Sequence, residues 1–180
     1  RILCELLDNE GLNYPIHIGV TEAGDGQDGR IKSAVGIGAL LAIGIGDTIR
    51  VSLTEKPEAE ILVAKDILQA SGDKIYKAEF VSCPSCGRTK YDIEAALAKV
   101  KQECSHLVGI KIGVMGCIVN GPGEMADAHY GYVGSGNKKV NLYRSKDLVY
   151  SNIDEDKAIE MLKEMIRQDG NWKDKLDIIK

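Results

Sequence analysis

Hydrophobic residues in the first part of the chain alternate between short β-type runs and stretches with helical spacing. A helix is expected over residues 2–10, and β-rich runs predict strands at 16–20 and 48–53. Apolar residues then recur three and four positions apart at 31–42 and 58–70, the spacing of amphipathic helices. This alternation favours a parallel sheet with helices on its outside, either an open sheet or a portion of a (β/α)8 barrel.

A polar stretch at residues 71–77 separates this pattern from a second one. The elements expected after it are, in chain order, a strand at 78–82, a helix at 91–104, a strongly apolar strand at 110–119, a hairpin or irregular strands at 130–150, and an amphipathic helix around 158–166. We therefore place a boundary near residue 75 and predict an α/β protein with two domains, residues 1–75 and 76–180.

The composition is that of a folded globular protein, with 44% hydrophobic and 28% charged residues in a chain of 180. A net charge of -4 supplies no general attraction for nucleic acid or for an anionic membrane. The longest weakly polar run, residues 33–46, is shorter than the roughly 20 residues of a membrane-spanning helix. The five cysteines are unevenly spaced, which favours reduced thiols or metal-bound thiolates in a cytoplasmic protein over a disulfide framework.

Three cysteines and a glutamate form the strongest local signal for chemistry. Cys83 and Cys86, in the run CPSC, directly follow a β-type run, so two sulfurs project from one tight turn and can share a metal centre. Cys117 lies near the end of the apolar strand and supplies a third thiol. The run NGPGE after it is expected to reverse the chain and to return the Glu124 carboxylate toward the metal.

Zinc is the alternative to an iron-sulfur cluster at these residues, because C-x-x-C also occurs in redox pairs and zinc knuckles. Cys104, His106 or His129 could complete a site of three cysteines and one histidine. Cys4 and Cys104 are more simply explained by packing, and His17 and His129 by ordinary hydrogen-bonded roles. A structural zinc site is closed, whereas a weakly held carboxylate ligand can exchange for substrate and so implies chemistry.

The run at residues 24–29, GDGQDG, matches the dinucleotide-binding pattern G-x-G-x-x-G, and Asp47 follows about 20 residues later. Asp25 and Asp28 would place two carboxylates where a pyrophosphate must lie. Asp47 precedes the second strand, whereas the ribose-binding acid should follow it. We therefore interpret the run as a flexible acidic loop at the rim of a barrel.

Three separated stretches resemble the 4-hydroxy-3-methylbut-2-enyl diphosphate synthase family of the non-mevalonate isoprenoid pathway: SCPSCGRT, MGCIVNGPGEMADAHYGYVG and GVTEAGDGQDGRIKSAVGIGALLAIGIGDTIRVSL. The resemblance extends from about Tyr14 to the final helix. It implies the C-terminal units of a (β/α)8 barrel that binds substrate, followed by a small α/β domain with a 4Fe-4S cluster. The cluster ligands it implies are Cys83, Cys86, Cys117 and Glu124.

The same resemblance implies roles for four further residues. Glu22 corresponds to a catalytic carboxylate and Asn120 to an active-site asparagine, while Arg50 and Ser52 correspond to residues that hold the diphosphate. Glu22 follows a predicted strand, where barrel enzymes place their chemistry. Arg50 and Ser52 are two apart, so in a strand they face the same side. Without the resemblance, each would be interpreted as an ordinary surface or strand residue.

The implied activity is the reductive opening of 2-C-methyl-D-erythritol 2,4-cyclodiphosphate to 4-hydroxy-3-methylbut-2-enyl diphosphate, with ferredoxin or flavodoxin as electron donor and a homodimeric assembly. The GRT after Cys86 is most similar to a variant with a large extra domain, for which only residues 53–82 leave room here. Because Arg1 stands where Met is usual, the chain is expected to be an inactive part of a longer enzyme. An electron-transfer module and a zinc-stabilised domain are the alternatives.

Overall fold

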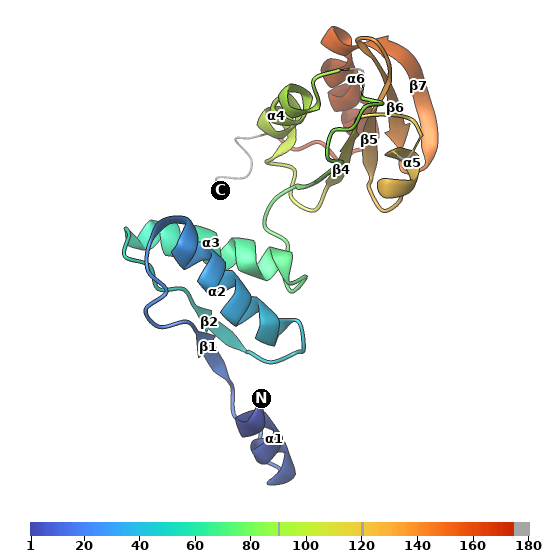
Figure 1. Cartoon of the computed structure of the whole chain (residues 1–180). Helices are drawn as coiled ribbons and strands as arrows, with labels where there is room; N and C mark the ends of the chain where they lie inside the picture. Colours follow the sequence, from blue (N-terminus) through green and yellow to red (C-terminus); the bar gives the residue numbers. More distant parts are fainter. Residues whose placement is uncertain (90, 120, 175–180) are drawn as a thin grey trace. The chain divides into compact units, whose positions relative to one another are not determined.

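A computed structural model describes residues 1–89, 91–119 and 121–174 of the chain. It divides the chain into two units, Arg1–Tyr76 and Lys77–Lys180 (Figure 1). Both units mix helices with strands, as the hydrophobic pattern predicts. No helix in the described part of the chain is both long and apolar enough to cross a membrane.

The first unit has the predicted order of elements after its N-terminal helix. These elements are α1 (Ile2–Asn9), β1 (His17–Gly19), α2 (Gly26–Leu41), β2 (Thr48–Arg50) and α3 (Pro57–Ala70). Strands β1 and β2 pair in parallel, with His17 opposite Thr48 and Gly19 opposite Arg50. Pro57 occupies the first turn of α3, where a missing backbone N–H costs no helical hydrogen bond.

Helices α2 and α3 cover one face of this small sheet. The core between them is formed by Ile18, Ile37, Leu41, Val51, Val63 and Ile67. Because strand residues alternate between faces, the opposite face carries His17, Thr48 and Arg50, and all three are exposed. Helix α1 contributes no residue to this core, and β2 contributes only the half-buried Ile49.

Two expectations for the first unit need correction. Helix α2 begins at Gly26, inside the run interpreted as a flexible loop, because Gly24 and Gly26 adopt left-handed backbone angles and Gly29 N donates to Asp25 O at 2.9 Å. Strand β2 ends at Arg50, so Ser52 lies just beyond it as a half-buried residue. Local glycine content pointed to a loop, and tertiary contacts override it.

The second unit is built on a five-stranded mixed sheet. Its elements are β3 (Glu79–Ser82), α4 (Ile93–Cys104), β4 (Lys111–Met115), α5 (Gly121–Glu124), β5 (Tyr130–Gly136), β6 (Lys139–Arg144), β7 (Asp147–Asp154) and α6 (Glu155–Gln168). The strand order is β3-β4-β5-β6-β7. The pairs β3–β4 and β4–β5 are parallel, and β5–β6 and β6–β7 are antiparallel. The expected hairpin is therefore a three-stranded meander, and β4 is shorter than the run predicted at 110–119.

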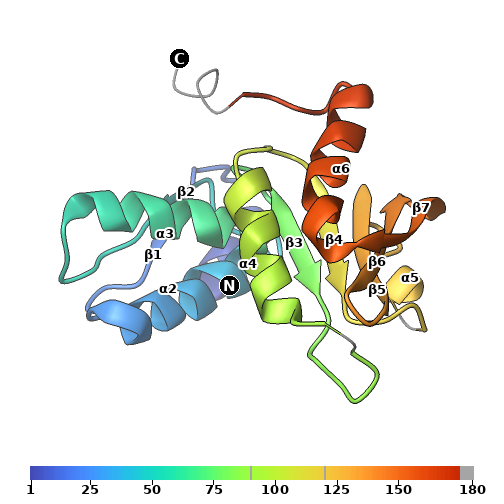
Figure 2. The same ribbon diagram turned by 90° about the horizontal axis from the view of Figure 1, so that it is seen from above.

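This sheet is covered on both faces. Helices α4 and α6 pack on one face (Figure 2) against Ile112 and Val114 of β4 and Tyr130 and Tyr132 of β5. The other face carries a smaller cluster of Met115, Met125, Ala128, Val133 and Tyr143. Burial on both sides explains why β4 is apolar at nearly every position instead of alternating.

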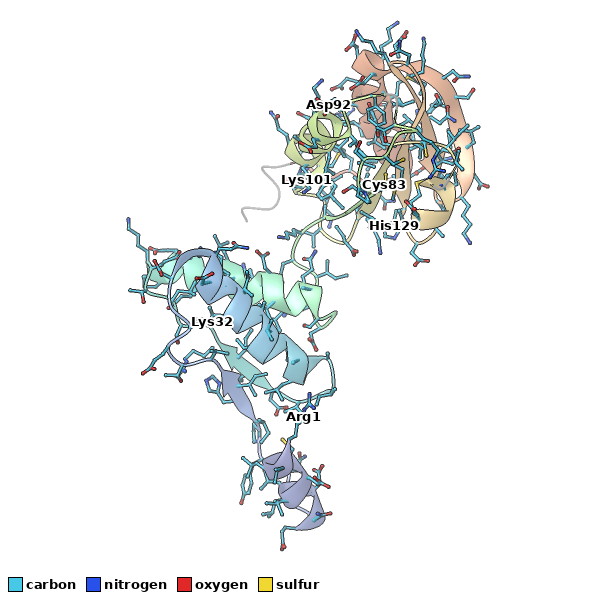
Figure 3. All side chains as sticks on the ribbon, in the orientation of Figure 1. Arg1, Lys32, Cys83, Asp92, Lys101 and His129 are labelled. Atoms are coloured by element: carbon cyan, nitrogen blue, oxygen red, sulfur yellow. The ribbon has the colours of Figure 1, made fainter. Side chains whose placement is uncertain are left out.

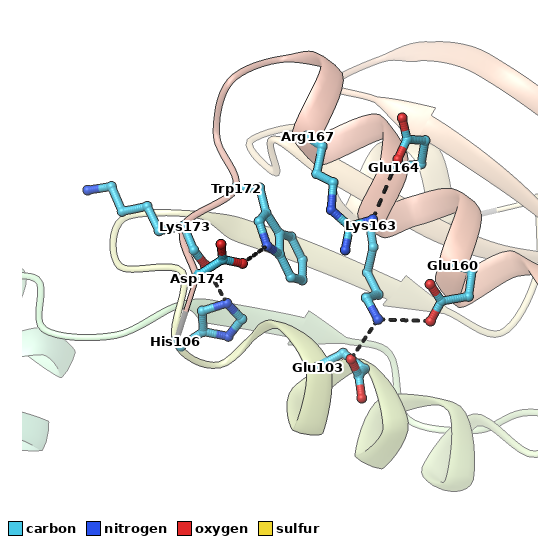
Figure 4. A network of polar contacts seen from close by, with 9 residues as sticks. All are labelled: Glu103, His106, Glu160, Lys163, Glu164, Arg167, Trp172, Lys173 and Asp174. Atoms are coloured by element: carbon cyan, nitrogen blue, oxygen red, sulfur yellow. Dashed lines mark hydrogen bonds and ion pairs between the residues drawn. The ribbon is translucent and has the colours of Figure 1, made fainter. Parts of the chain in front are cut away.

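Residues that follow α6 fold back and join it to α4 (Figure 4). The Arg167 guanidinium lies 4.7 Å from the centre of the Trp172 ring, and the His106 ring meets the same indole edge-on at 5.2 Å. His106 Nε2 donates to Lys173 O at 2.9 Å, and Lys163 Nζ pairs with Glu103 at 2.9 Å. These contacts hold α4 and α6 together on one face of the sheet.

Candidate functional site

A cavity of about 190 Å³ opens beyond the C-terminal ends of β3 and β4. Its lining consists of Cys83, Pro84, Cys86, Arg88, Cys117, Gly121 and Glu124. All four ligands predicted from the sequence therefore border one space, although the loops that carry them are far apart in the chain. Cys83 is labelled in Figure 3.

The parallel pairing of β3 with β4 brings the first and third cysteines together. Ser82 lies opposite Val114, so Cys83 and Cys117 leave the sheet from neighbouring strand ends. Gly116 N donates to Cys83 Sγ at 3.2 Å. Hydrogen bonds of this kind to sulfur stabilise thiolates and tune iron-sulfur clusters.

The turn after Cys86 is closed by its own hydrogen bonds. Thr89 N donates to Cys86 O at 2.9 Å, and Cys86 N donates to the Thr89 hydroxyl at 3.3 Å. This closure directs the exposed Cys86 thiol into the cavity together with the half-buried Cys83. The GRT that follows the C-x-x-C run is thus part of the turn that presents the sulfur.

Arg88 gives this cavity a positive charge. Its backbone N–H and then its guanidinium lower the pKa of Cys86, and the Thr89 hydroxyl acts in the same direction. Both Cys86 and Cys117 raise the pKa of the Arg88 guanidinium. A thiolate is the form of cysteine that binds metal, so Arg88 favours the ligand state at Cys86.

Tyr91 supports the loop that follows β4. Its hydroxyl donates to Met115 O at 2.9 Å, and its ring lies 6.1 Å from that of Tyr132. Burial raises the pKa of both phenols, so both stay neutral. Neither Arg88 nor Tyr91 was among the predicted site residues. The only sequence signal for them is their position close after the two cysteines.

Glu124 reaches the cavity from the short helix α5. Gly121, which begins this helix, is buried, and a Cβ there would lie 2.9 Å from both Met115 Cβ and Val133 Cγ1. Only glycine lets α5 approach the sheet this closely. The sharp reversal predicted for this run is therefore a helical turn. Asn120, the predicted active-site asparagine, lies outside the described residues.

The donor set of the cavity consists of three thiols and one carboxylate. Among residues 1–89, 91–119 and 121–174, no three His, Cys, Asp or Glu side chains converge closely enough to hold one metal ion. Three thiols and a carboxylate around a common cavity suit a group with several metal atoms, each bound by one side chain.

The residues proposed to complete a zinc site are engaged elsewhere in the described structure. Cys104 lies fully buried in the core under α4, and His106 donates to Lys173 O. His129 Nδ1 accepts a hydrogen bond from Lys111 N at 2.9 Å. The described lining of the cavity includes none of these three side chains.

Glu22 and Arg50 lie at the end of the small sheet in the first unit, and Ser52 is half-buried just beyond β2. Arg50 Nη2 donates to Thr21 Oγ1 at 2.9 Å, next to Glu22. Glu22 is exposed and has a left-handed backbone with φ of 60°. His17 shares a hydrogen bond of 2.8 Å with the Thr48 hydroxyl on the same face. Glu22 and Arg50 therefore belong to one polar edge of this unit.

Two family models match the chain, one to each unit. The GcpE TIM-barrel domain matches residues 4–65, and the GcpE protein C-terminal domain matches residues 79–168. The chain belongs to the GcpE family. The GcpE C-terminal match spans the β3 and β4 loops and α5, so the whole cysteine cavity lies within it.

Curated GcpE relatives carry the name 4-hydroxy-3-methylbut-2-en-1-yl diphosphate synthase (ferredoxin). A relative from Prochlorococcus marinus is 57% identical over 174 residues, which are 97% of this chain and 42% of that protein. A relative from a Synechococcus strain is 59% identical over the same shares of the two chains. The chain therefore spans about two fifths of the length of these relatives.

Proposed function

We propose that this chain is the cluster-bearing part of a reductive synthase that opens 2-C-methyl-D-erythritol 2,4-cyclodiphosphate to 4-hydroxy-3-methylbut-2-enyl diphosphate. Cys83, Cys86, Cys117 and Glu124 hold a 4Fe-4S cluster. The observation that carries the proposal is their common cavity in a chain of the GcpE family. The names of the relatives support ferredoxin as the electron donor, with flavodoxin as the alternative.

The two units take different parts in this reaction. Residues 1–75 contribute βα units to a substrate-binding barrel, and residues 76–180 form the cluster domain. The separate family matches and the polar, uncovered face of β1 and β2 support this division. In a (β/α)8 barrel, the substrate binds at the mouth of the barrel. An exposed polar face of two strands there would contact the substrate. The active assembly is a homodimer.

When bound, the cluster supplies electrons and an iron that polarises a substrate oxygen. The protein side chains then have distinct roles. Arg88 offsets negative charge on the sulfurs, and Gly116 N–H donates to Cys83. Glu124 would hold the cluster through its carboxylate, whereas the other three residues would hold it through thiolates. Overall, the substrate gains two electrons and two protons and loses water.

The first unit provides the groups that hold the diphosphate and move a proton. The Arg50 guanidinium and the Ser52 hydroxyl bind phosphate oxygens, because a planar guanidinium pairs with two oxygens at once. Glu22 transfers a proton to or from the substrate. From the second unit, Asn120 orients the reacting oxygen.

Anaerobic reconstitution of the 180-residue chain with iron and sulfide tests the proposed ligands. We expect a brown protein with acid-labile sulfide, and loss of the cluster absorbance when Cys83, Cys86 or Cys117 is changed to serine. Cys4→Ser is the matched control, because Cys4 lies in the first unit and is also half-buried. A colourless protein with stoichiometric zinc would contradict the proposal.

A second experiment separates the synthase from an electron carrier. In a protein that carries this sequence at the full length of its relatives, the cyclic diphosphate is added to the reduced cluster. A spectral change that disappears in Glu124→Ala supports catalysis at the iron beside Glu124. An unchanged spectrum with rapid ferredoxin oxidation would indicate an electron-transfer module.

A further inference from the structure

Two loops leave the same edge of the small sheet in the first unit, one after β1 and one after β2. Three hydrogen bonds join these loops: Arg50 Nη2 to Thr21 Oγ1 at 2.9 Å, Thr54 N to Gly24 O at 2.9 Å, and Gly26 N to Glu55 Oε1 at 2.8 Å. The segment that contains Glu22 is therefore hydrogen-bonded at three places to Arg50 and to the loop that follows it.

Arg30 completes this attachment from the first turns of α2. Its two terminal nitrogens donate to the two oxygens of Glu55, at 2.5 and 2.8 Å, and Nη1 also donates to Gly26 O at 2.8 Å. Glu55 thus accepts from the backbone of one loop and from a helix side chain at the same time. Paired guanidinium and carboxylate groups fix orientation as well as distance.

The packing of Gly29 brings α2 against both loops. This glycine is buried, and a Cβ would lie 2.8 Å from Leu53 Cδ2 and 3.0 Å from the Gly24 carbonyl carbon. In the G-x-G-x-x-G run, Gly24 and Gly26 therefore allow the chain to turn, and Gly29 allows close packing. The Gly26 amide, at the start of α2, already has Glu55 as its partner, so the run is neither a dinucleotide site nor a flexible loop.

Glu22 lies between the first and second of the three attachment points. Its φ of 60° is uncommon for a residue with a side chain and persists where surrounding contacts impose it. The contacts that impose it hold the chain on both sides of Glu22, at Thr21 and at Gly24.

We infer that Arg30 and Glu55 are positioning residues. They hold the loop between β1 and α2 in place, so that the Glu22 carboxylate keeps a fixed orientation. The inference rests on the proposed catalytic role of Glu22. It assigns to Arg30 and Glu55 no contact with substrate. Their effect is to raise the fraction of molecules in which the Glu22 side chain is correctly oriented.

A double-mutant cycle tests this in a cluster-loaded protein that carries this sequence at the full length of its relatives. We expect Glu55→Gln to lower kcat by about 10- to 100-fold, the range for misplacing a reacting group, while KM for the cyclic diphosphate changes much less. Glu22→Gln is measured alone and together with Glu55→Gln. If Glu55 acts through Glu22, the second substitution adds no further loss in the double variant.

Arg30→Lys supplies a second variant in case Glu55→Gln folds poorly, because it retains the charge and loses the paired geometry. It should also lower kcat, by less than Glu55→Gln. Asp154→Asn is the matched control, since it removes a comparable ion pair with Lys139 in the second unit, and it should leave kcat unchanged.

Each failure has its own signature. Full activity of Glu22→Gln would refute the proposed catalytic role of Glu22. Low activity of Glu22→Gln with an additive loss in the double variant would refute the positioning role and leave the proposed function intact.

Hydrogen exchange provides a readout that does not depend on activity. In the 180-residue chain, Glu55→Gln should speed exchange of the Gly26 and Thr54 amides and leave the Gly29 amide, which bonds within α2, slow. Unchanged exchange at Gly26 and Thr54 would overturn the inference.

Discussion

The two units stabilise their candidate residues in different ways. The second unit has a sheet covered on both faces, and its cysteine loops extend from the edge strand β3 and the buried strand β4. The first unit covers one face of two short strands and leaves large apolar side chains exposed: Ile2, Leu3 and Leu6 of α1, Ile31 and Val35 of α2, and Ile61 and Leu62 of α3. Packing therefore positions the cysteines, whereas hydrogen bonds between loops position Glu22.

The largest expected difference is in resistance to unfolding, when the two units are produced as separate fragments. We expect residues 77–180 alone to unfold in one cooperative transition and residues 1–76 alone to unfold at a much lower urea concentration, because fewer buried side chains offset the chain entropy of the smaller unit. Far-ultraviolet circular dichroism during urea unfolding measures this, since both units contain helices. Trp172, the only tryptophan of the chain, reports the second unit by fluorescence in both the fragment and the intact chain.

The intact 180-residue chain is the control for these fragments. Its Trp172 transition should coincide with that of residues 77–180. A cooperative transition of residues 1–76 at the same urea concentration would show that the two units are equally well packed, and the comparison would fail.

Truncating one core side chain should have the next largest effect. Leu162 of α6 is fully buried in the larger core, so Leu162→Ala should lower the free energy of unfolding of the second unit by about 2–5 kcal/mol. Leu148→Ala is the control, since Leu148 is 50% exposed and its loss should change stability by only about 0.5 kcal/mol. Urea denaturation followed at Trp172 measures both. Equal effects of the two substitutions would contradict the assigned core.

Helices and the sulfur site were the parts most open to prediction from sequence, because their signals are local. Apolar spacing predicts α3 and α6, and the C-x-x-C run with Cys117 and Glu124 predicts a shared centre. These four side chains border one cavity, and the centre itself stays a prediction. The meander of β5 to β7 was less clear, since register shifts interrupt its alternation of apolar and polar residues.

The supporting residues could not be predicted, because their partners are distant in the chain. Glu55 is 25 residues from Arg30, and Tyr91 is 24 residues from Met115. Each of these side chains is an ordinary surface or helix-border residue by pattern alone. Only the parallel pairing of strands places the loops side by side and gives such residues their contacts.

Thiol reactivity should reveal a smaller difference within the second unit. Because the Arg88 backbone and guanidinium lower the pKa of Cys86, this thiol should react with iodoacetamide at lower pH than an ordinary cysteine. In Arg88→Gln the pH profile should move toward the ordinary value only in part, since the backbone N–H remains. Mass spectrometry of the metal-depleted chain gives the rate at Cys86. An unchanged profile in Arg88→Gln would exclude the guanidinium as a cause.

The smallest expected effect is the pH dependence of the first unit. The hydrogen bond from Arg30, followed by that from Gly26, lowers the pKa of Glu55 in the folded chain. A carboxylate with a lowered pKa stabilises the fold above its unfolded pKa and loses this contribution as the pH falls through the folded pKa. Hydrogen exchange at Thr54 should therefore differ between the wild-type chain and Glu55→Gln at neutral pH and converge in acid. A difference that persists below the lowered pKa would show that Glu55 acts through packing and not through its charge. Packing would then position the loops of the first unit, as it does in the second.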